Sequence, residues 1–163
     1  MNYRYKISLL FVLCSLLLTN CASDGSCRQT AAVSLGIEFY KSRFDIGLEE
    51  YVYETYTDTL TIFGLGNDSL LANGSLIREI RLPLKPFDNQ STYIFEPKYL
   101  LPDTITFFYE NENNFISLEC GCLVLHRITD IEHTFHNIDS VVIKNNFAAD
   151  EKAKNIRIYF KNR

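Results

Sequence analysis

The sequence predicts an all-β protein, an antiparallel β-sandwich of about eight strands. Short runs of β-branched and aromatic residues alternate with polar residues at the period of two that is expected of a half-buried strand. Clusters of Gly, Asn, Asp and Pro separate these runs and predict turns. No long segment carries apolar residues at the 3.6-residue period of an amphipathic helix. Many short strands with turn signals between them favour two packed sheets.

Eight segments carry the strand pattern. In the first, Val33, Leu35, Ile37 and Phe39 alternate with other residues, so their side chains share one face of a strand. In the third, Pro83 has no backbone N–H to donate, which places that strand at a sheet edge. The predicted strands are residues 32–39, 59–63, 80–84, 92–95, 104–109, 115–128, 138–144 and 155–161.

The segments between the strands carry signals of their own. Residues 111–114, Asn-Glu-Asn-Asn, predict a hairpin turn between two strands. Residues 64–67 predict another turn, and Gly121 predicts a bulge in a long strand. Residues 148–154 predict one or two helical turns. No segment has the composition of a linker, so we expect residues 27–163 to form a single β-sandwich domain.

The first 20 residues predict a signal peptide for export that is cleaved from the mature protein. Arg4 and Lys6 make a basic start, and residues 7–18 form an apolar run that is too short to span a bilayer. Cys21 follows at the position of a lipoprotein cleavage site, so we expect it to carry acyl chains such as palmitate. Residues 21–26 would then be a short lipidated tether. Several acyl chains anchor a protein stably, because each buried methylene contributes about 0.8 kcal/mol.

The residues after Cys21 favour one compartment. Ala22 is not the aspartate that would resemble an inner-membrane retention signal, so we expect the outer membrane. The single acid in residues 23–26 favours its periplasmic face over the cell surface. Cleavage removes two basic residues and no acid, which leaves 14 basic and 20 acidic side chains and a net charge of −6. An acidic chain without basic clusters does not have the composition of a nucleic-acid-binding protein.

Three cysteines remain in the expected domain: Cys27, Cys120 and Cys122. An exported protein favours disulfides, and an odd number leaves one bridge and one spare thiol. Cys120 and Cys122 would lie roughly 6.5 Å apart along a strand, a poor geometry for bridging each other. We therefore expect Cys27 to pair with either Cys120 or Cys122.

Four triplets of an acid, a hydroxyl residue and an aliphatic residue recur along the chain. Their hydroxyl residues are Thr59, Ser69, Thr104 and Ser140. Turn chemistry explains such a triplet, because Asp caps a turn and the hydroxyl residue enters the strand that follows. The triplets also resemble the O-glycosylation acceptor of exported Bacteroidetes proteins, which would make these four residues acceptors.

One cluster of residues is of a type that binds metals or reacts with oxidants. Cys122, His126, His133 and His136 offer a thiol and three imidazoles, which are ligands of zinc and copper. Neither the Cys-x-Cys spacing nor the His-x-x-His spacing is that of a structural zinc site. A hydrolase would need Cys, His and Asn to converge in space, and no local signature of one is present. We therefore expect no cofactor and no catalytic residue.

Tyr51, Tyr53 and Tyr56 form a third group of interest. Exposed together, they would make an aromatic patch for a glycan or a partner protein. Packing of tyrosines within a sheet is the commoner role of such residues.

From residue 27 to its end, the chain resembles an uncharacterised lipoprotein family of the Bacteroidetes, a domain of unknown function. The motifs that carry this resemblance are Cys27-Arg28-Gln29, residues 58–66, Leu82-Pro83-Leu84, residues 117–121 and residues 155–160. The family pattern has one cysteine near its start and one in Glu-Cys-Gly, so the resemblance implies a disulfide between Cys27 and Cys120. No activity comes with the resemblance.

These observations together predict a non-enzymatic outer-membrane lipoprotein. We expect it to be held to the membrane by the lipid on Cys21 and to serve as a binding or structural module for an envelope protein or a glycan. The alternative is a metal-binding or thiol-redox envelope protein that uses Cys122 and the nearby histidines.

Overall fold

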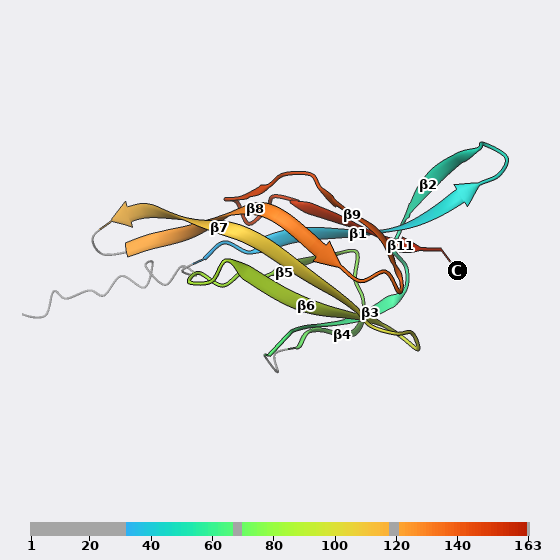
Figure 1. The fold of residues 1–163 in the computed structure, drawn as a ribbon, viewed down its shortest axis with the longest axis horizontal. Helices are drawn as coiled ribbons and strands as arrows, with labels where there is room; N and C mark the ends of the chain where they lie inside the picture. Colours follow the sequence, from blue (N-terminus) through green and yellow to red (C-terminus); the bar gives the residue numbers. More distant parts are fainter. Residues whose placement is uncertain (1–31, 67–69, 118–120, 163) are drawn as a thin grey trace, which may run out of the picture.

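The computed structural model describes residues 32–66, 70–117 and 121–162. These residues form two β-sheets that pack against each other (Figure 1). The all-β sandwich that the sequence predicts is therefore confirmed. The described part of the chain contains no helix with the length and hydropathy needed to cross a membrane.

The described residues contain more strands than the eight expected. In chain order they are β1 (Leu35–Asp45), β2 (Glu50–Thr55), β3 (Thr59–Gly64), β4 (Leu70–Leu76), β5 (Glu79–Leu82), β6 (Gln90–Pro97), β7 (Asp103–Ser117), β8 (Gly121–His133), β9 (Ile138–Ile143), β10 (Phe147–Ala148) and β11 (Ile156–Lys161).

Two sheets divide these strands between them. Sheet B contains β2-β1-β11-β9 in that order, with β5 also paired to β1, and sheet A contains β10-β8-β7-β6-β3-β4. Neighbouring strands run antiparallel except β1 and β11, the first and last described strands, which pair in parallel. Sheet B therefore combines strands from both ends of the described chain. Sheet A is antiparallel and is built from the middle of the sequence.

Strands β2, β4 and β10 were missed by the sequence pattern. In β4 the Asn73-Gly74 pair has the composition of a turn, yet it lies within the strand at a register shift against β3. Gly74 has a positive φ of 56°, a backbone conformation that glycine adopts without strain. A bulge can thus keep a turn-like dipeptide inside a ladder.

The hairpin turn expected at residues 111–114 is wrong. Strand β7 continues through these residues to Ser117 and pairs with β8 along this stretch. Polar cross-strand contacts hold the segment extended: Glu112 accepts a hydrogen bond from Arg127, and Asn111 contacts His126. Residues 118–120 lie outside the described residues. Gly121, where we expected a bulge, has a φ of 72° and lies next to a register shift between Phe115 and Ser117.

The helical turns expected at residues 148–154 are also wrong. Strand β10 ends at Ala148, and a turn follows in which the Asp150 carboxylate accepts a hydrogen bond from the Lys152 amide. The Ala153 amide donates to the Asp150 carbonyl oxygen. Local bonding of an Asp side chain to the next amides competes with helix formation, and here it favours the turn.

The core lies between the sheets and is rich in aromatic side chains. Phe39 of β1 contacts Phe95 of β6 in the opposite sheet edge to face, with ring centroids 6.1 Å apart. Phe160 of β11 and Tyr56 pack on the same ring. Burial also raises the pKa of Tyr56. Of the three tyrosines grouped by the sequence, Tyr56 is thus a core residue.

One buried carboxylate ties the two sheets together. Asp103 begins β7 and is fully buried, and it faces residues 134–138, where the chain crosses from β8 in sheet A to β9 in sheet B. Its carboxylate accepts hydrogen bonds from the Thr134 hydroxyl (2.7 Å), from the backbone amides of His136 (2.8 Å), Asn137 (2.7 Å) and Ile138 (3.2 Å), and from the Asn137 side chain (2.9 Å). Burial by itself raises the pKa of Asp103, but these hydrogen bonds together lower it below 3.8. The ionised carboxylate therefore stabilises the fold at neutral pH, and that contribution is lost as the pH falls below 3.8.

A buried asparagine, Asn155, also joins the two sheets through hydrogen bonds. The Asn155 side chain accepts a hydrogen bond from the Gly36 amide and donates to the carbonyl oxygens of Asn145 and Phe147. It thereby joins β1 of sheet B to the segment that enters β10 of sheet A. Gly36 is required for the close approach, because a Cβ atom there would lie 2.1 Å from the carbonyl oxygen of Ala153.

A histidine sits in the interior of sheet A. His126 is fully buried, its ring packs edge-on against Tyr109 with centroids 5.0 Å apart, and its Nδ1 lies 2.7 Å from the Asn111 amide oxygen. Its Nε2 has no hydrogen-bond partner within the described residues. Burial lowers the pKa of His126, so the ring is neutral in the folded protein at neutral pH.

We predict that Asp103→Asn lowers the free energy of unfolding by about 3 kcal/mol, because the new amide group turns a donor towards backbone amides that need an acceptor. Urea denaturation followed by circular dichroism measures the loss. Asp88→Asn is the matched control, since the exposed Asp88 carboxylate forms a surface ion pair with Lys85 and its loss should change stability by less than about 0.5 kcal/mol. Equal effects of the two substitutions would refute the role of Asp103.

We predict that stability also falls as the pH is lowered below 6.5, the ordinary pKa of the His126 ring. The unfolded chain takes up a proton on His126 below its ordinary pKa of 6.5, whereas the buried ring does so only at lower pH. His126→Phe keeps the ring and removes the titration. The difference in unfolding free energy between pH 7.5 and pH 5.5 should therefore shrink in this variant, and an unchanged difference would assign the pH dependence to other groups.

Candidate functional site

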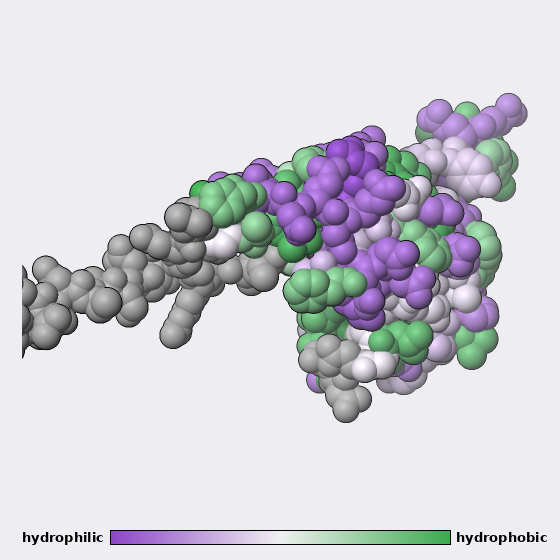
Figure 2. All heavy atoms as spheres, turned by 60° about the vertical axis from the view of Figure 1, so that its left-hand side comes forward, coloured by the Kyte–Doolittle hydropathy of each residue, from purple (hydrophilic) through white to green (hydrophobic). Residues whose placement is uncertain are grey.

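The β1–β2 hairpin carries a group of exposed apolar side chains. This hairpin projects beyond the packed sheets at the end of the molecule opposite to the end where the described chain begins (Figure 1). Figure 2 shows it standing clear of the rest of the molecule, with hydrophobic and hydrophilic residues side by side. At its tip Ile46 is 84% exposed and Leu48 is 63% exposed.

Aromatic side chains continue from the hairpin onto the outer face of sheet B. The register pairs Phe44 with Tyr51 across β1 and β2, and their rings meet edge to face at 5.4 Å. Tyr53 packs on Tyr159 of β11 at 4.7 Å, and Tyr159 packs in turn on Tyr40 at 5.6 Å. We call these five residues of three adjacent strands the aromatic surface. Tyr40 and Tyr159 are half-buried, and the other three are more than half exposed.

The turn of the hairpin is built by its own side chains. Asp45 accepts hydrogen bonds from the amides of Gly47 (3.0 Å) and Leu48 (3.3 Å). These two bonds, and then the nearby Arg43, lower the pKa of Asp45, so the turn keeps its ionised cap at neutral pH. Glu49 completes the turn with a positive φ of 54°. The turn of the hairpin is thus fixed by hydrogen bonds within the turn itself.

Strand β2 is the edge of sheet B and has acidic side chains on one face. It pairs only with β1 among the described strands, so its other side carries unpaired backbone donors and acceptors. Glu50, Val52 and Glu54 alternate with Tyr51 and Tyr53 along it, so the acids and the aromatic rings lie on opposite faces. Arg43 contacts Glu54 on the acidic face. An added strand would therefore meet an aromatic face on one side and an acidic face on the other.

The sequence grouped Tyr51, Tyr53 and Tyr56, and the structure divides them. Tyr51 and Tyr53 are exposed on the aromatic surface, whereas Tyr56 is buried in the core. Phe44 and Ile46 were missed. The signal that could have found them is a second apolar series on the opposite face of the first strand, since Tyr40, Phe44 and Ile46 are separated by even intervals and are out of step with Phe39.

The residues of the metal or redox alternative do not come together. Cys122 and His133 lie near opposite ends of β8, about 36 Å apart along the strand. His126 is buried between them beside Asn111, and His136 lies at the crossover, where its Nδ1 contacts the Pro102 carbonyl oxygen at 2.9 Å. No group of three or more His, Cys, Asp or Glu side chains in the described residues is placed to hold a metal ion.

Most of the predicted covalent sites fall outside the described residues. These are the lipid-bearing Cys21, the paired Cys27 and Cys120, and the acceptor Ser69. Cys122, within the described residues, is exposed and has a free thiol.

The three acceptor candidates that the structure describes differ in their surroundings. Thr59 is half-exposed at the start of β3, and Asp58 before it pairs with Lys41 at 2.8 Å. Thr104 follows the buried Asp103, and its amide donates to Thr134. Ser140 is half-buried in β9. In the triplet that begins with Asp103, the acid therefore has the capping role that turn chemistry assigns to it.

Comparison with known proteins identifies the family of the chain. A family of unknown function, DUF6452, matches residues 59–160. No curated protein and no solved structure matches the chain. The matched segment begins with β3 and runs to the penultimate residue of β11, so it contains all of sheet A and, of sheet B, β5, β9 and nearly all of β11. Because the match spans more than half of the sequence, the chain belongs to the DUF6452 family of unknown function.

Proposed function

We propose that this protein is a non-enzymatic outer-membrane lipoprotein that binds an envelope protein through the β1–β2 hairpin. The observation that carries the proposal is the exposed aromatic surface on a projecting sheet edge. A two-stranded ribbon that stands alone in water is marginally stable, and a contiguous apolar patch on a soluble domain marks an interaction site.

The anchor and the binding surface would lie at opposite ends of the molecule. The signal pattern at residues 1–20 supports lipid attachment at Cys21, with the periplasmic face favoured. The described chain begins beside β8, where the Val33 amide donates to the Val124 carbonyl oxygen. The residues between Cys21 and this contact span at most about 40 Å when extended. A lipid on Cys21 would hold that end near the membrane and present the hairpin away from it (Figure 1).

The surface chemistry of β2 indicates what the partner offers. Its open edge favours an extended segment that adds a strand to sheet B. On such a strand, side chains next to Tyr51 and Tyr53 would be apolar, and those next to Glu50 and Glu54 would be basic. The proposed partner segment therefore alternates apolar residues with Lys or Arg. Charge attraction of this kind weakens as salt is added.

We predict that Cys21→Ser moves the protein from the membrane fraction to the soluble periplasmic fraction, because it removes the lipid attachment atom. Cys122→Ser is the matched control and should leave the protein in the membrane. The intact mass of the native protein, measured without reductant, tests the cleavage site, the acylation and the disulfide together. We expect the mass of a chain that starts at Cys21, carries acyl groups and lacks two hydrogens. A native chain without acyl groups would contradict the anchor, and one with all thiols free would contradict the disulfide between Cys27 and Cys120.

We predict that an alternating Lys-Val peptide binds the mature protein and protects amides of β2 from hydrogen exchange, whereas a Glu-Val peptide of the same length does not. Tyr53→Ser should weaken binding about tenfold by removing the aromatic contact. Glu54→Lys should weaken it by charge reversal, and Phe87→Ser, which changes a loop side chain that is 95% exposed, should have no effect.

In cells, a photo-crosslinking side chain at Leu48 should join one envelope protein, and one at Phe87 should not. The segment joined should have the alternating pattern and should bind when synthesised. Equal affinity for the two test peptides, or equal crosslinking from both positions, would refute strand addition at β2.

A further inference from the structure

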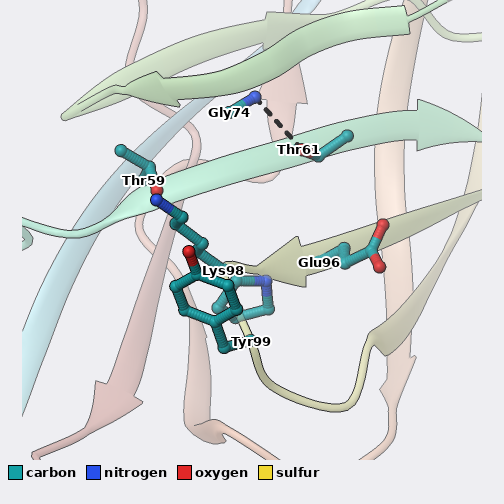
Figure 3. A pocket seen from close by; sticks show the side chains of 7 residues that line it. Thr59, Thr61, Gly74, Glu96, Lys98 and Tyr99 are labelled. Carbon is teal, nitrogen blue, oxygen red and sulfur yellow. Dashed lines mark hydrogen bonds between the residues drawn. The ribbon is translucent and has the colours of Figure 1, made fainter.

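A polar hollow lies on the outer face of sheet A, on different strands from the aromatic surface. Its volume is about 420 Å³, and strands β3, β4 and β6 and the loop after β6 line it (Figure 3). Small-molecule sites in proteins have volumes of about 300–1,000 Å³. The size of the hollow therefore suits a small organic ligand.

Strand register places hydroxyl and charged groups along the hollow. Leu60, Ile62 and Phe95 point into the core, so the residues that alternate with them, Thr59 and Thr61 on β3 and Glu96 on β6, lie on the outer face. Thr61 and Glu96 are paired directly across the two strands. A ligand in the hollow would thus meet both a donor and an acceptor within one cross-strand pair.

Gly74 keeps the hollow open on its β4 side. Its amide donates to the Thr61 hydroxyl oxygen at 3.1 Å, which leaves the Thr61 hydroxyl proton available to a ligand. Gly74 has a φ of 56° at the register shift between β3 and β4, where a residue with a side chain would be strained. The wall of the hollow there is therefore bare backbone.

Tyr99 stands at the rim in an unusual conformation. It has a positive φ of 63°, which is disfavoured for a bulky aromatic residue, and its side chain is 90% exposed. Burial does not explain this conformation, because the ring has almost no contact with the core. Lys98 lies over the ring at 4.8 Å from its centroid, and the Leu100 amide donates to the Pro97 carbonyl oxygen at 3.2 Å to close the turn. The turn thus holds an aromatic face beside the hollow at a cost in backbone strain.

The charges at the hollow nearly balance. Glu96 and Lys98 are both exposed, and neither takes part in a salt bridge within the described residues. A single carboxylate is too few ligands for a metal ion, and the negative charge of Glu96 in the lining disfavours an anion. The remaining chemistry is an aromatic face, two threonine hydroxyls, one strong donor and one strong acceptor.

From this combination we infer that the hollow binds a neutral saccharide. The C–H face of a sugar ring packs on Tyr99, and its hydroxyl groups bond to Thr59, Thr61, Glu96 and Lys98. This site does not involve the β1–β2 hairpin, and its saccharide ligand is a different class from the protein partner proposed above. The two proposals can therefore fail separately.

The test uses the lipidated mature protein in a detergent without a sugar headgroup. Methyl glycosides of glucose, galactose, mannose and N-acetylglucosamine serve as the probes, and saturation-transfer NMR detects their binding. At least one glycoside should bind with a dissociation constant of roughly 1 mM and should show the strongest transfer at the protons of one ring face. Absence of transfer to all four glycosides would overturn the proposal.

Tyr99→Gly separates binding from folding. Glycine adopts a positive φ without strain, so the thermal midpoint of this variant should be unchanged or higher, while its affinity for the glycoside falls at least tenfold. Thr61→Val should also weaken binding, and both Phe87→Ala and Tyr53→Ala should leave it unchanged. A fall in thermal midpoint with Tyr99→Gly, or binding that survives the loss of the ring, would assign Tyr99 a structural role and overturn the proposal. A hexose-sized addition on the peptide that contains Thr59 would overturn it as well, because the hollow would then be filled by the chain's own modification.

Discussion

The Asp103 carboxylate is the interaction on which the arrangement of the two sheets depends. It stands at the start of β7, in the middle of sheet A, and holds the short crossover through which the chain enters sheet B. A buried carboxylate is tolerated because five donors from that crossover satisfy it, and those donors are in turn tolerated because the carboxylate is ionised. Neither the crossover nor the charge would be stable alone. Asn155 also joins the two sheets, but through a neutral side chain: it accepts a hydrogen bond from the Gly36 amide and donates one to the carbonyl oxygen of Phe147 in β10.

These polar contacts and the aromatic core fix the two sheets against each other. The β1–β2 hairpin extends beyond the region that they fix. Strands β1 and β2 continue beyond the contact of the sheets, and there their side chains change from buried to exposed while their pairing continues unbroken. A hairpin with a capped turn would lose little chain entropy on binding the partner that we propose. The same argument about chain entropy applies to Tyr99, because a closed turn already fixes the position of its ring. At the hairpin and at Tyr99, the sandwich holds a short segment in place, and the side chains of that segment form the proposed site.

The two proposed sites differ in their relation to the family. The family match begins at Thr59, so the hollow beside Tyr99 lies entirely within it, whereas the β1–β2 hairpin lies before it. The chemistry of the sites differs in the same way: an acidic and aromatic strand edge suits a chain segment, and a small polar hollow suits a sugar. The two proposed sites lie on different sheets, so binding at one does not require residues of the other.

The sequence by itself determined the fold class and most of the strands, because burial of one strand face imposes a period of two that is readable without knowing the partners. It also carries the local patterns from which we expect export and lipid attachment at Cys21. It did not determine that Asn111 and its neighbours extend β7, because their polar side chains are held by Arg127 and His126 on the partner strand. Nor did it distinguish Tyr56 from Tyr53, since both fit a sheet and only the packing of Phe160 and Tyr159 decides which ring is covered. Exposure of a side chain is a property of what the rest of the chain leaves uncovered, and for that reason the candidate sites emerged only from the tertiary structure.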